Sequence, residues 1–255
     1  DPLAEGVLPI ALGEATKLAG RMLDSDKIYA FTVKFGEETD TLDTEGPIIA
    51  TSDLRPALAQ VEGVLARFTG PIEQVPPAYS ALKIDGQRAY DLARAGETVE
   101  MKPRRVRIDG LALLARPDRD HADLVVTCGK GTYIRSLGRD LAVALGTVGH
   151  LSALRRTAAG PFREEAAISL PKLEALGHIP ALLGALVPVV TALDDIPALA
   201  LTETQADQLR HGQPVLLTRD ASPSGALFRA ELGERLVALV RSDGAALQPV
   251  RVFNL

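Results

Sequence analysis

The densest group of side chains with an evident binding chemistry lies between residues 83 and 107. This segment contains seven basic and four acidic residues, a local net charge of +3 in a chain whose formal net charge is −5. Binding to a phosphate backbone depends on local basic surface and not on total charge. The segment therefore indicates either contacts to nucleic-acid phosphates or a solvated charged face, and its composition leaves both interpretations open.

Other reactive side chains form no motif that spacing alone would identify. The four histidines are isolated and lack the spacing of metal ligands. The GKGT sequence at 129–132 lacks the earlier glycine of a phosphate-binding loop, and the aspartates of DTLD at 40–43 are too far apart for an aspartyl phosphotransfer motif. The single cysteine, Cys128, excludes a disulfide framework and a cysteine-based zinc site. The sequence thus gives no signature of a metal or cofactor.

Hydrophobic periodicity predicts the elements that must position these residues. Alternation from 28 to 35 predicts a strand. Helical spacing after residue 51 predicts a helix, with Thr51 or Ser52 as N-cap and a stop at Gly70–Pro71. Further strands are expected at 106–115 and 123–128, and further helices at 132–146 and 169–177.

The proline-containing segment 71–103 is polar and basic, and we expect it to leave the core with a short helix near 86–95. After residue 192 the pattern changes to short strand-like runs separated by Gly, Pro and Ser. This change predicts a small β domain over 194–255, with a joint at 192–197.

Composition places the chain among ordinary globular proteins. With 255 residues, 46% of them hydrophobic, it can form one large domain, or one large and one small domain. No apolar run reaches 18 residues free of Gly and Pro, so we expect no membrane span. The single cysteine and the lack of a visible signal peptide favour a cytoplasmic protein.

Five stretches between residues 1 and 162 are similar to the motifs of one enzyme family. They read DPLAEGVLPIALGEATKLAG (1–20), KIYAFTVKFGEETDTLDTEG (27–46), PPAYSALKIDGQRAYDLARAG (76–96), GKGTYIRSLGRDL (129–141) and HLSALRRTAAGPF (150–162). In this order they resemble the motifs of the bacterial tRNA pseudouridine synthases that act on uridine 55, the TruB family. The tail from residue 194 carries no single diagnostic motif.

The resemblance implies an α+β fold. We expect a mixed, mainly antiparallel sheet flanked by helices in a catalytic domain over 1–192, with an RNA-gripping insertion at about 71–103. A small PUA-like β domain is expected over 194–255. Family members begin some tens of residues earlier, so the chain is expected to lack an N-terminal segment and to start at the catalytic aspartate.

The resemblance also implies a reaction, the isomerisation of uridine to pseudouridine in the T loop of tRNA. This reaction breaks a C–N bond and forms a C–C bond, and it needs no metal or cofactor. Asp1 is expected to be the nucleophile, Arg135 to pair with it, and Tyr29 to stack on the flipped uracil and assist proton removal. The expected substrate-binding residues are Tyr133, Leu154, Tyr79, Lys83, Arg88, Tyr90, Lys102, Arg104 and Arg105.

The expected partner is the T arm of tRNA, with no membrane and no metal, and the protein is expected to be a monomer. A non-catalytic tRNA-binding or RNA-folding module is the main alternative. A small-molecule hydrolase that uses Asp1 is a third, but it explains neither the basic segment nor the C-terminal β pattern.

Overall fold

The computed structural model describes residues 2–97, 99–216 and 223–255. Asp1, the expected nucleophile, is outside the described residues. The chain forms two compact units, one from 1–8 and 23–167 and the other from 9–22 and 168–255.

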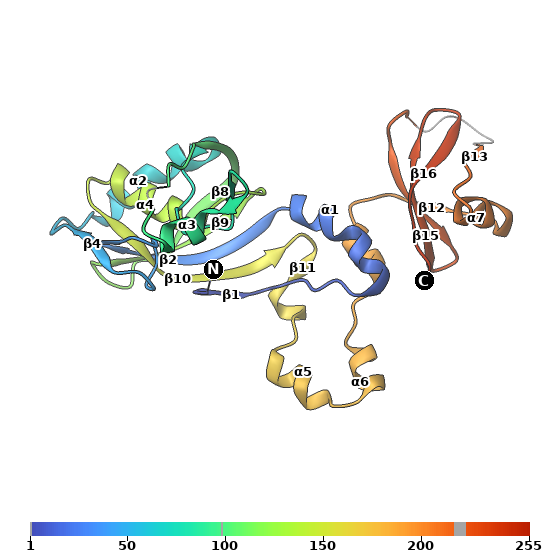
Figure 1. Ribbon diagram of the computed structural model, residues 1–255, viewed down its shortest axis with the longest axis horizontal. Coiled ribbons are helices and arrows are strands. Elements are labelled where there is room, and N and C mark those ends of the chain that lie inside the picture. Colours follow the sequence, from blue (N-terminus) through green and yellow to red (C-terminus); the bar gives the residue numbers. More distant parts are fainter. Residues whose placement is uncertain (1, 98, 217–222) are drawn as a thin grey trace. The chain divides into compact units, whose positions relative to one another are not determined.

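A seven-stranded sheet is the framework of the first unit (Figure 1). Its strands run in the order β1-β10-β2-β9-β8-β5, and β11 also pairs with β10. Only β1 and β10 are parallel, so the expected mainly antiparallel sheet is confirmed. The strands are β1 (Ala4–Gly6), β2 (Lys27–Phe35), β5 (Gly70–Gln74), β8 (Arg104–Ala115), β9 (His121–Cys128), β10 (Gly149–Ala159) and β11 (Phe162–Arg163).

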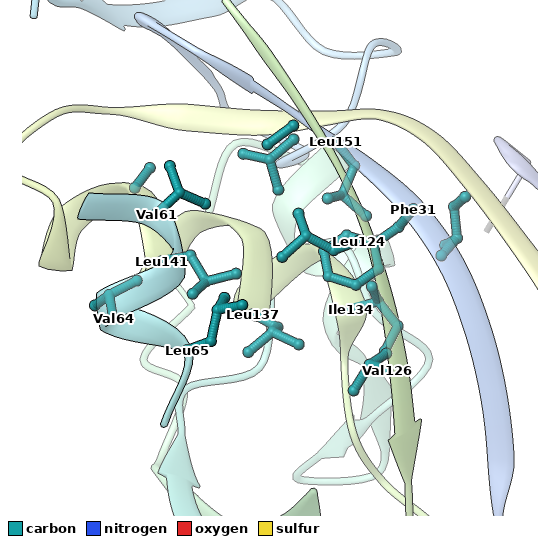
Figure 2. Close-up of a cluster of buried hydrophobic side chains, with 14 of the residues drawn as sticks. Phe31, Val61, Val64, Leu65, Leu124, Val126, Ile134, Leu137, Leu141 and Leu151 are labelled. Atoms are coloured by element: carbon teal, nitrogen blue, oxygen red, sulfur yellow. The ribbon is translucent and has the colours of Figure 1, made fainter. Parts of the chain in front are cut away.

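Helices α2 (Leu58–Leu65) and α4 (Ile134–Ala144) provide apolar side chains that pack with those of the sheet in one buried cluster (Figure 2). Because Gly138 has no side chain, α4 can approach β10 closely, and a Cβ there would lie 2.6 Å from Leu151 Cδ2. The cluster holds the first turn of α4 in place against the sheet. Its members include Phe31, Val61, Leu124, Val126, Ile134, Leu137, Leu141 and Leu151.

Two sequence expectations in this unit were wrong in part. The helix expected from residue 51 begins only at Leu58, because a proline disfavours helical geometry in the preceding residue and Pro56 follows Arg55. The excursion expected from residue 71 begins only after Gln74, because β5 pairs with β8 in the central sheet.

Two small ribbons extend from this unit. β3 (Glu37–Thr39) and β4 (Ile48–Thr51) flank the loop 40–47. β6 (Lys83–Ile84) and β7 (Gln87–Arg88) form a hairpin whose two turn residues, Asp85 and Gly86, both have positive φ. An Asp-Gly pair suits this turn because these residues adopt positive φ at low cost. The short helix α3 (Ala89–Arg94) follows directly, as expected.

The second unit is built on a five-stranded sheet in the order β12-β14-β15-β16-β13, which confirms the expected C-terminal β fold. Residues 9–22 belong to it, because Leu18 is buried with Leu193, Leu236 and Phe253. The joint expected at 192–197 therefore lies within this compact unit. One of the strand-like runs of the tail, PVLLT at 214–218, ends in two residues that lie outside the described residues.

The other elements complete the two units. η2 (Ala66–Phe68) and η3 (Glu164–Ala166) belong to the first, and α1 (Ala19–Asp24) spans the division between the two. The second contains η1 (Gly13–Leu18), α5 (Leu170–Leu176), α6 (Ile179–Gly184), η4 (Val189–Leu193), β12 (Ala198–Ala200), α7 (Glu203–Arg210), β13 (Val215–Leu216), β14 (Leu227–Leu232), β15 (Arg235–Ser242) and β16 (Ala246–Val252). None of the helices in the described residues is long and apolar enough to cross a membrane.

Candidate active site

Arg135 lies in the first turn of α4 and is almost completely buried, with 5% of its surface exposed. Its Nη1 donates to the carbonyl oxygen of Thr41 at 2.8 Å, and its Nη2 donates to the carbonyl oxygen of Tyr79 at 2.8 Å. Burial lowers the pKa of Arg135 and the nearby carboxylate of Asp43 opposes this change. Because the side chain is buried, Arg135 is not a solvated arginine on the surface of α4.

Asp43 supplies a buried negative charge to Arg135, with 3.3 Å between its Oδ2 and Nη1. Its own exposure is 1%. The Oδ1 atom accepts hydrogen bonds from Thr41 Oγ1 at 2.6 Å and from the backbone N–H of Glu45 at 3.0 Å. These bonds compensate part of the cost of removing the carboxylate from water, which is large for an unpaired charge.

Tyr79 lies on the other side of the guanidinium. It is half-buried, and its hydroxyl donates to Asp40 Oδ2 at 3.0 Å. This hydrogen bond raises the pKa of Tyr79, so the phenol stays neutral. Tyr79 therefore contacts the loop 40–47 through its side chain and Arg135 through its backbone.

The N-terminus of α4 is fixed by Gln74 at the end of β5. Gln74 is buried, and its Oε1 accepts a hydrogen bond from the backbone N–H of Tyr133 at 2.8 Å. Tyr133 is the N-cap residue of α4 and its side chain is half-buried. The arrangement sets where the helix begins, and hence where Arg135 enters the site.

Strand β1 brings the first stretch of the chain to β10, with Ala4 opposite Leu154 and Gly6 opposite Arg156. Gly6 has a φ of 91°, and a Cβ there would lie 2.2 Å from the carbonyl oxygen of Arg156. Only glycine fits this approach. Two hydrogen bonds between Val7 and Arg156 continue the contact, at 2.8 Å and 2.6 Å.

Tyr29 and Leu154 lie on the neighbouring strands β2 and β10. Leu154 is 4% exposed and belongs to the core cluster, against which the half-buried Tyr29 packs. Burial raises the pKa of Tyr29, and the guanidinium of Arg156 opposes this change. The hydroxyl is therefore held neutral, which suits stacking or hydrogen-bond donation better than direct removal of a proton.

The expected RNA-contacting residues other than Tyr79 lie on the insertion and on β8. Lys83 and Arg88 are exposed and directly opposite each other in the β6–β7 hairpin. The ring of Tyr90 lies 5.7 Å and 5.5 Å from the guanidinium carbons of Arg88 and Arg94, within cation–π range. The remaining exposed basic residues are Lys102, Arg104 and Arg105.

Arg104 and Arg105 do not share one surface. Successive side chains of a strand point to opposite faces. Arg104 shares its face with the buried Val106 and Ile108, whereas Arg105 shares the opposite face with Arg107. The side chains of Arg104 and Arg105 therefore lie on opposite faces of β8.

The structure brings Arg135, Tyr133 and Tyr79 together and places Tyr29 beside Leu154. Sequence reasoning missed Asp43, Asp40, Gln74 and Arg156. The DTLD sequence at 40–43 was considered only as a phosphotransfer motif. The acidic residues of the loop 40–47 were a usable signal, because a buried arginine needs a counter-ion. Within the described ranges, no group of three or more His, Cys, Asp or Glu side chains could hold a metal ion.

Two family models match the chain. The family model for the N-terminal domain of TruB family pseudouridylate synthases matches residues 1–134, and the tRNA pseudouridylate synthase B C-terminal domain matches residues 135–194. The tRNA pseudouridine synthase B of Novosphingobium aromaticivorans is 56% identical, and that of Caulobacter sp. strain K31 is 52% identical. The alignments cover 100% of this chain and 84% and 85% of those proteins, respectively.

Among solved structures, a Cbf5-Nop10-Gar1 complex contains a chain that matches with a TM-score of 0.71 at 25% identity. The match covers 100% of this chain and 74% of the other. A chain of an H/ACA RNP bound to a substrate RNA containing 2′-deoxyuridine shares the fold, with a TM-score of 0.73 at 22% identity and the same two coverages. Family models that together match 194 of 255 residues, and relatives at more than 50% identity, show that this chain belongs to the TruB family of tRNA pseudouridine synthases.

Proposed function

We propose that this tRNA pseudouridine synthase acts on uridine 55 of the T loop, with Asp1 as the nucleophile and Arg135 as the cation that keeps it ionised. The observation that carries the proposal is the buried guanidinium of Arg135, fixed by the carbonyl oxygens of Thr41 and Tyr79. Carbonyl acceptors orient a guanidinium without neutralising its charge. A guanidinium can contact more than one carboxylate through its forked donors, and we propose Asp1 as a carboxylate beside Arg135 in addition to Asp43.

The reaction needs an ionised carboxylate in a site from which water is excluded. The C1′–N1 bond of uridine breaks, the base turns, a C5–C1′ bond forms, the C5 proton leaves to solvent, and N1 takes up a proton. Asp1 can start this sequence by adding to the base or by attacking the sugar. In either route, removal of water would raise the pKa of the Asp1 carboxyl group. A fixed cation such as Arg135 opposes that change and favours the ionised form.

Tyr29 and Leu154 are proposed to surround the flipped base, and Tyr133 to flank it. Stacking on an aromatic ring and an apolar wall compensates part of the few kcal/mol that extrusion of a base costs. The raised pKa of Tyr29 supports a neutral hydroxyl at this position. Sequence proximity supports the placement of Asp1, because β1, which begins three residues after it, pairs with β10 at Leu154.

The insertion is proposed to grip the T arm. Lys83 and Arg88 are exposed, directly opposite each other and of like charge, a pairing that destabilises a hairpin unless an anion lies nearby. An RNA phosphate would supply that anion. We propose that Tyr79, Tyr90, Lys102, Arg104 and Arg105 complete the contact, that residues 194–255 act as a PUA-like accessory binding domain, and that the enzyme is a cytoplasmic monomer.

Tritium release from a T-loop transcript that contains 5-tritiated uridine tests the proposal. We expect release by the wild-type enzyme, none by Asp1→Asn, and similar tRNA affinity for both. A transcript with cytidine at position 55 serves as the substrate control and should release nothing. Tight binding by the wild-type protein without release would instead favour the RNA-binding module.

A further inference from the structure

Arg135 is held by two chain segments that are far apart in sequence. Thr41 belongs to the loop 40–47, and Tyr79 belongs to the segment that leads from β5 into the insertion. The two carbonyl oxygens keep their spacing only while these segments stay together. The position of the guanidinium therefore depends on whatever joins them.

The side chains of Asp40 and Tyr79 make that connection. Tyr79 Oη donates to Asp40 Oδ2 at 3.0 Å, and Asp40 directly precedes Thr41 in the chain. No other hydrogen bond directly joins residues 39–47 to residues 75–81 in the described part of the chain. A closed ring results, which runs from Arg135 to Thr41, through Asp40 to the Tyr79 hydroxyl, and from the Tyr79 carbonyl back to Arg135.

Asp40 itself has little freedom to turn away. Its Oδ1 is buried and would lie 1.9 Å from a Cβ on Gly46, so a side chain at that position is incompatible with the observed carboxylate. The loop backbone also closes on itself, because the N–H of Asp40 donates to the carbonyl of Pro47 at 3.2 Å. The carboxylate is thus aimed at Tyr79 by its own loop.

Tyr79 is equally fixed to the insertion. The N–H of Tyr90 donates to the carbonyl of Ser80 at 3.1 Å, and the N–H of Ala89 donates to the carbonyl of Leu82 at 2.7 Å. These bonds connect the β6–β7 hairpin to the residues that follow Tyr79. A displacement of the hairpin would reach the Tyr79 carbonyl through a short and hydrogen-bonded path.

We propose that Asp40 and Tyr79 are positioning residues, whose side-chain hydrogen bond sets the orientation of Arg135 and connects the basic insertion to the reaction site. The inference rests on the proposed role of Arg135. It assigns the Tyr79 hydroxyl to the site, and it leaves the aromatic ring of Tyr79 for the RNA contact proposed above. It also gives Asp40 a role that differs from that of Asp43, because Asp40 acts through backbone position and Asp43 through direct charge.

Single-turnover tritium release at saturating tRNA, together with tRNA affinity by filter binding, tests this role. Tyr79→Phe and Asp40→Ala should each lower the single-turnover rate roughly 10- to 100-fold, the range for a displaced catalytic group, and change affinity less than two-fold. Asp40→Asn keeps an acceptor oxygen and should restore most of the rate. The double variant Tyr79→Phe, Asp40→Ala should be no slower than either single variant, because both remove one interaction.

Thr32→Val is the matched control. It removes another hydroxyl-to-carboxylate hydrogen bond, from Thr32 Oγ1 on β2 to Asp123 Oδ1 on β9 at 2.6 Å, and its rate should stay at the wild-type level. Wild-type rates in both Tyr79→Phe and Asp40→Ala would overturn the inference. A loss of tRNA affinity in Tyr79→Phe without a loss of rate would also overturn it, because that result would show that the hydroxyl contacts the RNA and does not position Arg135.

Arg135→Lys in the same assay separates this inference from the proposed function. If Arg135→Lys turns over normally, the role of Arg135 fails. If it is impaired while the Asp40 and Tyr79 variants are not, only the connection proposed here fails. Should Asp40→Ala unfold, as judged by its melting temperature, Tyr79→Phe and Asp40→Asn still decide the question.

Discussion

At the scale of single residues, the burial of Arg135 determines what its charge can do. Only 5% of the surface of Arg135 is exposed, so its attraction to a nearby carboxylate is stronger than it would be in water. At the protein surface, water would screen the same pair of charges. Its two fixed carbonyl partners define an orientation that a flexible ammonium does not reproduce.

Arg135→Lys should lower turnover roughly 100-fold while tRNA affinity stays within two-fold, because lysine keeps the charge but not the planar, forked donor set. Arg139→Lys, on the same helix and paired with Asp140, is the control and should keep near wild-type turnover. Tritium release and filter binding measure both quantities. Normal turnover in Arg135→Lys would contradict the assigned role.

The raised pKa of Tyr29 gives a prediction in alkaline solution. The chain has four tyrosines and no tryptophan, so absorbance at 295 nm reports phenol ionisation cleanly. Burial favours the protonated phenol in the folded state, so folded Tyr29 releases its proton only above the ordinary value of about 10. Between the unfolded and the folded pKa the folded state binds more protons, and its stability falls as pH rises through that window.

Tyr29→Phe should therefore remove part of the absorbance change above about pH 10 and none of the change below it. Spectrophotometric titration of both proteins tests this, with circular dichroism at each pH to confirm that they stay folded. A loss of the component below pH 10 would show that Tyr29 ionises more easily than its burial implies.

At the scale of elements, the pleat of β8 separates Arg104 from Arg105. Their side chains lie on opposite faces of the strand, so a single RNA surface cannot contact both equally.

We expect Arg104→Gln and Arg105→Gln to weaken tRNA binding unequally, and the double variant to combine the two effects. Loss of one phosphate contact lowers the slope of log affinity against log salt by roughly 0.7–0.9. Arg119→Gln, on the exposed turn between β8 and β9, is the charge-matched control and should leave the slope unchanged. Equal effects of the two substitutions would contradict the prediction, because they would show that the two faces of β8 contribute alike to RNA binding.

The parallel pairing of β1 with β10 depends on Gly6. Gly6→Ala places a Cβ against the Arg156 carbonyl at 2.2 Å and forces a positive φ on alanine, so β1 must detach or shift. We expect activity to fall at least ten-fold, because the strand that follows Asp1 loses its register, an effect of the size that misplaced reacting groups produce.

Gly13→Ala is the matched control, since Gly13 also has a positive φ, 54°, but has open space around its Cα. Gly13→Ala should lower stability by about 1–2 kcal/mol, the cost of a positive φ in alanine, and leave activity near the wild-type level. Thermal melting and tritium release separate the two effects. Equal losses in both variants would mean that φ alone, and not the contact with β10, limits position 6.

At the scale of the whole molecule, the division into compact units differs from the division of the sequence into domains. Residues 9–22 pack with the C-terminal unit. Lys17 Nζ donates to the carbonyl of Val252 at 2.9 Å, and Glu14 Oε2 accepts from the N–H of Asn254 at 2.8 Å. A role for 194–255 as a separately folding accessory domain therefore stays a prediction, and a cut at 194 would remove these partners.

Deletion of 194–255 should expose Leu18 and lower solubility, whereas the same deletion with Leu18→Gln should stay soluble because the central sheet keeps its core cluster. If the tail is an accessory binder, the soluble variant should show KM for tRNA raised several-fold and kcat within a few-fold of the intact enzyme. Size-exclusion chromatography and steady-state tritium release measure these properties. Aggregation of both variants would show that the tail stabilises the catalytic unit.

The family, the strands and helices with strong periodicity, and the β character of the tail could all be predicted from the amino-acid sequence. Strand β2 and helix α4 could be predicted because their apolar residues recur at the spacing that local geometry requires, and that spacing is a property of neighbours in the chain. The five motifs likewise identified Tyr29, Tyr133, Arg135 and Leu154 as candidate site residues.

The residues that surround Arg135 could be identified only from the folded chain. Asp43 lies 92 positions before it in the sequence and Tyr79 lies 56 before it, and no local pattern indicates that either contacts it. Sheet pairing decided that β5 joins the core and that Arg104 and Arg105 face apart, and the burial of Leu18 decided that residues 9–22 pack with the tail. Such contacts depend on burial and hydrogen bonding between distant segments, which a reading of neighbouring residues cannot supply.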